Sequence, residues 1–127
     1  MKKYAFLLIF PTLFILAGCG AGVAYPKLYI DENLPQYADA ALVQIIQDGP
    51  TLKDGVILRL ESSKDVKTIA AYYDGEMKKL GWVPPTENVP TNTSYATQWD
   101  KGDKYLHFTA SNITGKSQTI TISLMQK

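Results

Sequence analysis

SSKDVKTIAAYYDGEMKKLGW (residues 62–82) carries the clearest structural pattern in the sequence. Apolar side chains recur in it at three- and four-residue spacing, the period of one face of an α-helix: Val66, Ile69, Ala70, Tyr73, Met77 and Leu80. Ser62 or Ser63 can cap the helix, with Asp65 in its first turn. Gly81 can adopt the left-handed conformation that commonly ends a helix. We therefore expect an amphipathic helix, after which Trp82 folds back into the core.

Runs of alternating apolar and polar residues lie on both sides of this helix. Residues 55–61, 104–110 and 117–125 alternate as strands with one buried face do. Residues 41–47, ALVQIIQ, form a shorter apolar run. We pair that run with 55–61 as a hairpin, because the segment between them is rich in turn residues. The run could instead be helical, since alanines at its start favour a helix, while its β-branched residues oppose one.

A second hairpin is expected after the helix. Residues 95–99 and 104–110 flank the turn-forming sequence Asp-Lys-Gly-Asp at 100–103. One helix can cover only one face of a sheet, and the strands carry polar residues on their other face. The sequence therefore predicts an α+β fold of two layers, in which one α-helix packs across an antiparallel sheet of about five strands.

The N-terminal residues predict where the protein works. Lys2 and Lys3 precede an apolar stretch, residues 4–17, that is shorter than the about 20 residues a membrane-spanning helix needs. A charged start, a short apolar middle and small residues at the end are typical of a secretory signal peptide. Residues 16–19, Leu-Ala-Gly-Cys, resemble the lipobox of bacterial lipoproteins.

The lipobox resemblance implies a lipid anchor. In such proteins a diacylglyceryl group is attached to the cysteine sulfur, here that of Cys19, and the chain is cleaved before it. A further acyl chain such as palmitate is often added to the new amine, and several chains hold a protein firmly on a membrane. We therefore expect residues 1–18 to be a signal peptide, 19–34 a lipidated cysteine and tether, and 35–127 a single α+β domain. Within the tether, the cluster of Tyr25, Leu28, Tyr29 and Ile30 could instead pack on the domain as an extra edge segment.

The same resemblance indicates the compartment. The protein is expected in the cell envelope, anchored to a membrane by its lipid. In a bacterium with two membranes, Gly20 after the cysteine favours the outer membrane facing the periplasm, because an aspartate there tends to signal inner-membrane retention. In a bacterium with one membrane, the outer face of the plasma membrane is expected.

Composition restricts the partners. The 127 residues are 46% hydrophobic and 20% charged, as in ordinary globular chains. Removing Lys2 and Lys3 with the signal leaves 11 basic residues against 12 acidic ones. A near-neutral chain lacks the positive electrostatic potential that attracts nucleic acid, so nucleic acid is not expected as a partner. With one cysteine, no disulfide can form within the chain, so its stability depends on an apolar core.

The domain carries a second resemblance. Leu34-Pro35-x-Tyr37-x-Asp39-Ala40 precedes the strand pair, and the helix holds a Tyr-Tyr pair before its Gly-Trp end. These residues resemble a group of small, largely uncharacterised bacterial envelope lipoproteins in which a helix with an aromatic-Tyr pair ends in Gly-Trp. The resemblance spans residues 34–110, with Ala38 where a proline often stands. It implies the fold and the location and brings no catalytic residues.

Catalytic chemistry has little support in the sequence. His107 is the only histidine, and lipid would occupy the sulfur of Cys19, so no Cys–His pair remains. No cluster of histidines and cysteines has zinc spacing. We therefore expect a protein that is not an enzyme, with no metal and no cofactor. Four aromatic residues could form a binding patch or simply pack in the core: Tyr72, Tyr95, Trp99 and Tyr105.

The expected function is that of a lipid-anchored accessory or binding module for another envelope component, a protein or a glycan. Its binding surface is predicted on the polar face of the sheet, the proline-rich loop 84–94, or both. The sheet-face candidates are Tyr105, His107, Thr119 and Thr121.

Two alternatives stay open. A carboxylate-based hydrolase of envelope polymers would need two carboxylates about 5–10 Å apart in a cleft. A carrier of small ligands would need a closed apolar cavity between helix and sheet.

Overall fold

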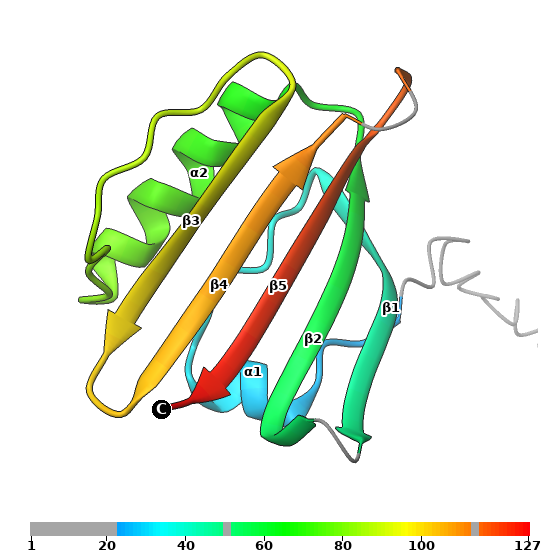
Figure 1. The fold of residues 1–127 in the computed structure, drawn as a ribbon. Coiled ribbons are helices and arrows are strands. Elements are labelled where there is room, and N and C mark those ends of the chain that lie inside the picture. Colours follow the sequence, from blue (N-terminus) through cyan, green and yellow to red (C-terminus); the bar gives the residue numbers. More distant parts are fainter. Residues whose placement is uncertain (1–22, 50–51, 113–114) are drawn as a thin grey trace, which may run out of the picture.

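Five antiparallel strands form one layer of the structure, a computed structural model that describes residues 23–49, 52–112 and 115–127 (Figure 1). The strands are β1 (Ala40–Gly49), β2 (Leu52–Ser62), β3 (Ser94–Lys101), β4 (Lys104–Ser111) and β5 (Gln118–Gln126). Their order across the sheet is β1-β2-β5-β4-β3, so the last strand lies between the two hairpins. The predicted signal peptide and Cys19 lie outside the described residues.

The β1–β2 hairpin settles the conformation of residues 41–47. They pair antiparallel with β2, so this run is strand and not helix. The register shifts between Leu42 and Gln44, which leaves Val43 as a bulge. Beyond the bulge, Ile45 pairs with Leu58, which is buried, and the next residue of β1 turns to the opposite face. The bulge thus keeps Leu42 and Ile45 on the core side of β1, while Val43 and Ile46 are exposed.

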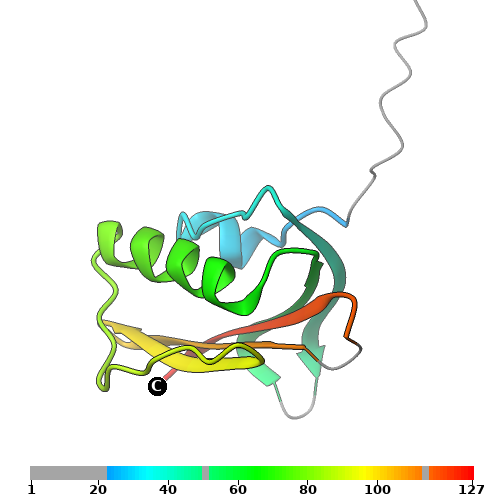
Figure 2. The same ribbon diagram turned by 90° about the horizontal axis from the view of Figure 1, so that it is seen from above.

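Helix α2 (Val66–Lys79) lies over β3 and β4 on one face of the sheet (Figure 2). Its N-cap is Asp65, whose carboxylate accepts a hydrogen bond of 2.7 Å from the Thr68 amide. The cap predicted at Ser62 or Ser63 is therefore wrong. The Ser62 hydroxyl instead donates to the Asp39 carbonyl at 2.7 Å and accepts from the Lys64 amide. The predicted end of the helix is confirmed, because Gly81 has φ of +83°.

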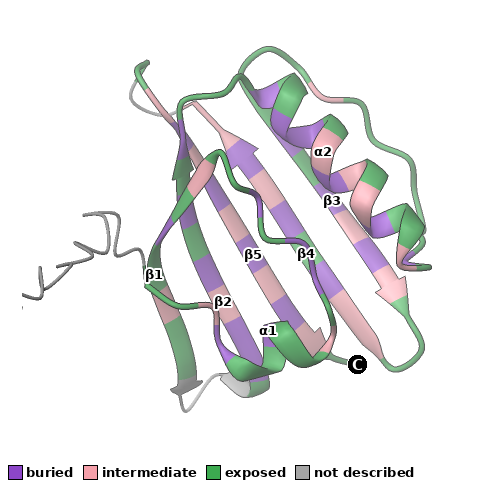
Figure 3. Ribbon diagram, turned by 180° about the vertical axis from the view of Figure 1, so that it is seen from behind, coloured by how far each residue is buried: buried purple, intermediate pink, exposed green. Residues whose placement is uncertain are grey.

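The core fills the space between this helix and the sheet. Buried residues alternate with less buried ones along the strands (Figure 3). The predicted stripe of α2 faces it, and Trp82 is only 2% exposed. At the centre, the Tyr73 ring packs on Phe108 with centroids 4.7 Å apart. The predicted two-layer α+β fold, with a helix across an antiparallel five-stranded sheet, is confirmed.

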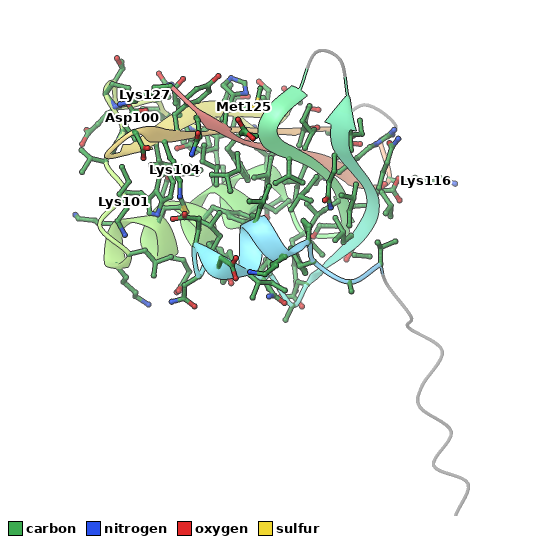
Figure 4. The ribbon with its side chains drawn as sticks, turned by 90° about the horizontal axis from the view of Figure 1, so that it is seen from below. Asp100, Lys101, Lys104, Lys116, Met125 and Lys127 are labelled. Atoms are coloured by element: carbon green, nitrogen blue, oxygen red, sulfur yellow. The ribbon has the colours of Figure 1, made fainter. Side chains whose placement is uncertain are left out.

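The C-terminal end is joined to the β3–β4 hairpin. The Lys127 amide donates to the Asp103 carbonyl at 2.8 Å, and the Lys127 ammonium pairs with Asp100 at 3.1 Å (Figure 4). The end of β5 is thereby fixed against the turn that joins β3 to β4.

A second helix, α1 (Lys27–Asp31), was not expected. Together with the chain on either side of it, this helix covers the part of the sheet that α2 leaves free (Figure 2). Tyr29 is 1% exposed, stacks on Tyr25 at 5.1 Å and donates to the Pro35 carbonyl at 2.6 Å. Leu34 is also buried, and Glu32 pairs with Lys104 of β4.

These contacts correct the predicted tether. Residues 25–34, which the sequence assigned to a tether over 19–34, pack on the domain as part of its fold. The physical reason is the apolar surface of the sheet beyond α2, which one helix cannot cover. Tyr25, Tyr29 and Leu34 remove that surface from water.

Candidate functional site

A pocket of about 440 Å³ lies where α2, the loop after it and β3 meet. Its volume falls within the about 300–1,000 Å³ that is typical of small-molecule sites. Aromatic and polar side chains share its lining: Asp74, Lys78, Trp82, Val83, Pro84, Glu87, Asn88, Tyr95, Thr97 and Trp99. This is the mixture of an apolar wall with a few polar groups that binding pockets show.

The outer edge of β3 holds the loop that forms one wall. Gly81 turns the chain, and Val83 then pairs with Asp100 through two backbone hydrogen bonds of 3.0 and 2.8 Å. Further along, the Asn88 amide donates to the Ala96 carbonyl at 2.9 Å. The proline-rich loop is thus attached to β3 at both of these points, and the pocket lies between it and α2.

The base of the pocket is aromatic. Tyr95, Thr97 and Trp99 alternate along β3, so all three point to the helix side of the sheet. Trp82 and Trp99 are each 2% exposed and close the base, whereas Val83 is 63% exposed at the rim. A ligand would therefore meet polar side chains at the entrance and little free aromatic surface below them.

A carboxylate–phenol pair is the most polar feature of the pocket. The Tyr95 hydroxyl lies 2.8 and 2.9 Å from the two carboxylate oxygens of Asp74 and donates to them. Burial raises the pKa of Tyr95, and the hydrogen bond to Asp74 raises it further. Burial also raises the pKa of Asp74, an effect that the bond from Tyr95 partly opposes. Asp74 is thus a partly desolvated carboxylate with capacity to accept further hydrogen bonds.

Sequence reasoning missed Asp74. The residue lies beside the apolar stripe of α2, between Tyr73 and Gly75, where an acidic side chain is ordinarily a solvated one. Its partner Tyr95 is 21 positions away on β3. Only the packing of the helix on the strand brings the two together, so no local signal in the sequence could have identified the pair.

The four sheet-face candidates share the face that points away from the helices. His107 pairs with Ser123, and Thr121 pairs with Thr109, so these residues lie in neighbouring rows of β4 and β5. Tyr105 and Thr119 follow the same alternation on the same strands. None of the described elements covers this face (Figure 2). The pocket residues of β3 point to the other side, so the structure separates the two predicted surfaces.

The four aromatic residues that could have formed one patch are dispersed. Tyr72 stacks on Tyr37 at 4.3 Å. Tyr95 and Trp99 pack around Phe108 with centroids at 6.0 and 5.4 Å, as core residues do. Tyr105 lies on the opposite face of the sheet.

Among the described residues, side chains fill the centre of the helix–sheet interface. The residues there are at most 1% exposed: Ile69, Tyr73, Met77 and Phe108. Packing of this kind argues against a carrier that holds its ligand between helix and sheet. Two carboxylates, Asp74 and Glu87, do line the surface pocket, which is the arrangement relevant to the hydrolase alternative.

Comparisons with known proteins add no assignment. No protein-family model, curated protein or solved structure matches this chain significantly. Within the described ranges, no group of three or more acidic, histidine or cysteine residues could hold a metal ion. No helix in that part of the chain is long and apolar enough to cross a membrane.

Proposed function

We propose that this protein is a lipid-anchored, non-enzymatic envelope lipoprotein that binds another envelope component. The lipobox supports the anchor at Cys19 and the location at a membrane surface. The pocket under the proline-rich loop supports the binding role, and it is the observation that carries the proposal. Its partner is a protein or a glycan that presents hydrogen-bond donors to Asp74.

Several features favour binding over catalysis. The only histidine, His107, lies on the sheet face opposite to the pocket, so it cannot act as a base for a group inside it. Asp74 accepts its hydrogen bond from Tyr95, which holds the carboxylate in place as a fixed acceptor. The polar face with Tyr105, His107, Thr119 and Thr121 provides a second surface for a larger partner.

Site-specific photo-crosslinking in living cells tests the binding role. A photoreactive residue is placed at Asn88 in the pocket rim, with a matched one at Lys67, which is exposed at the start of α2 and belongs to neither proposed surface. The Asn88 probe should capture a discrete species that disappears when Asp74→Ala is added. If Asn88 and Lys67 capture the same species, and Asp74→Ala has no effect, the pocket is not the binding site.

The anchor has its own test. Intact-mass analysis of the membrane-bound protein should show diacylglyceryl on Cys19 and no residues before it. Cys19→Ser should abolish lipid labelling and move the exported protein out of the membrane fraction. Unchanged fractionation of Cys19→Ser would contradict the anchor.

A carboxylate-based hydrolase is the second candidate, because Asp74 and Glu87 line one pocket. Burial raises the pKa of Asp74, as a general acid requires. Purified protein would be incubated with cell-wall polymers beside Asp74→Asn and Glu87→Gln. Hydrolysis that both substitutions abolish would establish the enzyme and overturn the non-enzymatic proposal.

A further inference from the structure

Three large apolar side chains are exposed at the start of the described chain. Val23 is 47% exposed, Leu28 46% and Ile30 51%. They belong to the segment that runs through α1, which lies beside α2 in the layer above the sheet (Figure 2). A cluster of exposed apolar residues in one short segment marks a contact surface more often than single scattered ones do.

Few residues separate this segment from the predicted anchor. Only residues 20–22 lie between Cys19 and Val23. Since each residue spans at most about 3.6 Å, Val23 is at most about 14 Å from the lipid-bearing cysteine along the chain. The headgroup layer of one leaflet is itself about 5–8 Å thick. The domain is therefore held directly at the bilayer surface rather than at the end of a long tether.

Helix α1 holds its exposed residues rigidly. Tyr29 is buried between Leu28 and Ile30 and bonds to the Pro35 carbonyl, so the helix cannot rotate. At about 100° per residue, Leu28 and Ile30 project from the two flanks of α1. Between them, on the outer side, Lys27 and Asp31 form an ion pair at 2.5 Å. The surface is thus apolar at its flanks and neutral at its centre.

We propose that residues 23–31 form a shallow membrane-contact surface, with Val23, Leu28 and Ile30 inserted among the lipid headgroups of the bilayer that holds Cys19. The inference rests on the lipid anchor of the proposed function. The occupant is a lipid surface because this segment is the first described one after the proposed lipid-bearing cysteine, which keeps it within reach of the headgroups. The neutral Lys27–Asp31 pair indicates that the contact depends on apolar burial and does not require anionic lipids.

The contact would set the orientation of the whole domain. Residues 23–31 lie on the helix side, and the sheet face with Tyr105, His107, Thr119 and Thr121 lies on the other side (Figure 2). A domain docked through α1 therefore directs this polar sheet face away from the membrane, where a second envelope component can reach it.

Quenching of a site-specific label tests the contact. The full lipidated chain is reconstituted in phosphatidylcholine vesicles with a fluorophore on Ile30→Cys or, as the matched control, on Arg59→Cys. The sulfur of Cys19 carries lipid, so only the new thiol reacts. The label at 30 should be shielded from a water-soluble quencher at low and high salt, whereas the label at 59 should not. With the label moved to Leu28→Cys, adding Ile30→Asp should raise quenching on the order of tenfold.

Each other outcome overturns the inference, and they are distinguishable. Equal quenching at 30 and 59 in a chain whose mass shows diacylglyceryl refutes the contact and leaves the anchor intact. An unmodified Cys19 refutes the anchor and the contact together. Shielding that grows with the protein-to-lipid ratio assigns the surface to a second copy. Shielding found only in native membranes assigns it to another protein.

Discussion

Replacing Tyr29 with alanine tests whether the N-terminal segment belongs to the folded core. The side chain is 1% exposed, stacks on Tyr25 at 5.1 Å and donates to the Pro35 carbonyl at 2.6 Å. An aromatic side chain buries about 150–250 Å², which at about 25 cal/mol per Å² corresponds to about 4–6 kcal/mol. Measured truncations of buried aromatic residues fall at about 3–5 kcal/mol. Tyr29→Ala should therefore lower the free energy of unfolding by about 3–5 kcal/mol.

A milder substitution separates the ring from its hydroxyl. Tyr29→Phe keeps the stacking but leaves the Pro35 carbonyl without its donor, which should cost about 1–3 kcal/mol. Because a small domain has only about 5–15 kcal/mol of stability, Tyr29→Phe remains measurable even if Tyr29→Ala does not fold.

Urea denaturation of the full chain in mild detergent, followed by the fluorescence of the buried tryptophans, provides the measurement. Leu28→Ala is the control in the same helix, because its side chain is 46% exposed and should change stability by about 0.5 kcal/mol or less. Equal urea midpoints for Tyr29→Ala and Leu28→Ala would contradict the assignment of residues 25–34 to the folded core. The segment would then be a tether that contributes nothing to the fold.

Four further substitutions have defined outcomes. In urea denaturation, Gly75→Ala should stabilise the protein by about 0.5–1 kcal/mol, because Gly75 is helical and exposed, and a methyl group there would meet no atom within 4 Å. Gly81→Ala should destabilise the protein by about 1 kcal/mol, because the φ of Gly81 is +83°. If Gly75→Ala and Gly81→Ala changed the free energy of unfolding in the same direction, the helix end at Gly81 would be contradicted. The hydrogen bond from the Thr68 amide lowers the pKa of Asp65. The stability that the Asp65 carboxylate contributes is therefore present above the ordinary aspartate pKa and is lost as the pH falls through the lowered value. Asp65→Ala should accordingly be less stable than the parent at pH 7 in thermal unfolding, with a difference that vanishes in acid. Burial raises the pKa of Asp74. The contribution of Asp74 to folding stability is therefore most favourable below the ordinary aspartate pKa and is lost as the pH rises through the raised value. Asp74→Asn should gain stability relative to the parent between acid and pH 7, and a loss over that range would show that Tyr95 outweighs burial.

The helix was predictable because its signals are local. The stripe of α2 and the stop at Gly81 are all encoded within one segment. The cap was not, since it was expected at Ser62 or Ser63, with Asp65 in the first turn. Ser62 is withdrawn from capping by its bond to the Asp39 carbonyl, 23 positions away, which leaves Asp65 as the cap.

The sheet was predictable in kind but less so in detail. Alternation identified the strands, and turn residues identified the two hairpins. The choice between helix and strand for residues 41–47 depended on pairing with β2, which periodicity in so short a run cannot reveal. The position of β5 between β2 and β4 is likewise a non-local property of the fold.

Helix α1 and the Asp74–Tyr95 pair were not predicted, because both depend on tertiary packing. Helix α1 has five residues, too few for an apolar period to be recognised, and Gly and Pro residues near it resemble a linker. Its role comes from the area of sheet that α2 leaves uncovered. The Asp74–Tyr95 pair similarly exists only once helix and strand have packed.

The pairing of Val83 and Asn88 with the outer edge of β3 has a consequence for crowding. If Cys19 carries the lipid that we propose, copies of this protein diffuse in two dimensions and meet at one height and in one orientation. An open strand at each side of the sheet would let such copies join laterally without limit. The loop already occupies the donor and acceptor of Asp100 and the carbonyl of Ala96 on β3, whereas no other segment among the described residues pairs with the outer edge of β1. Two copies joined through β1 would form a closed pair, and growth into a ribbon would stop there.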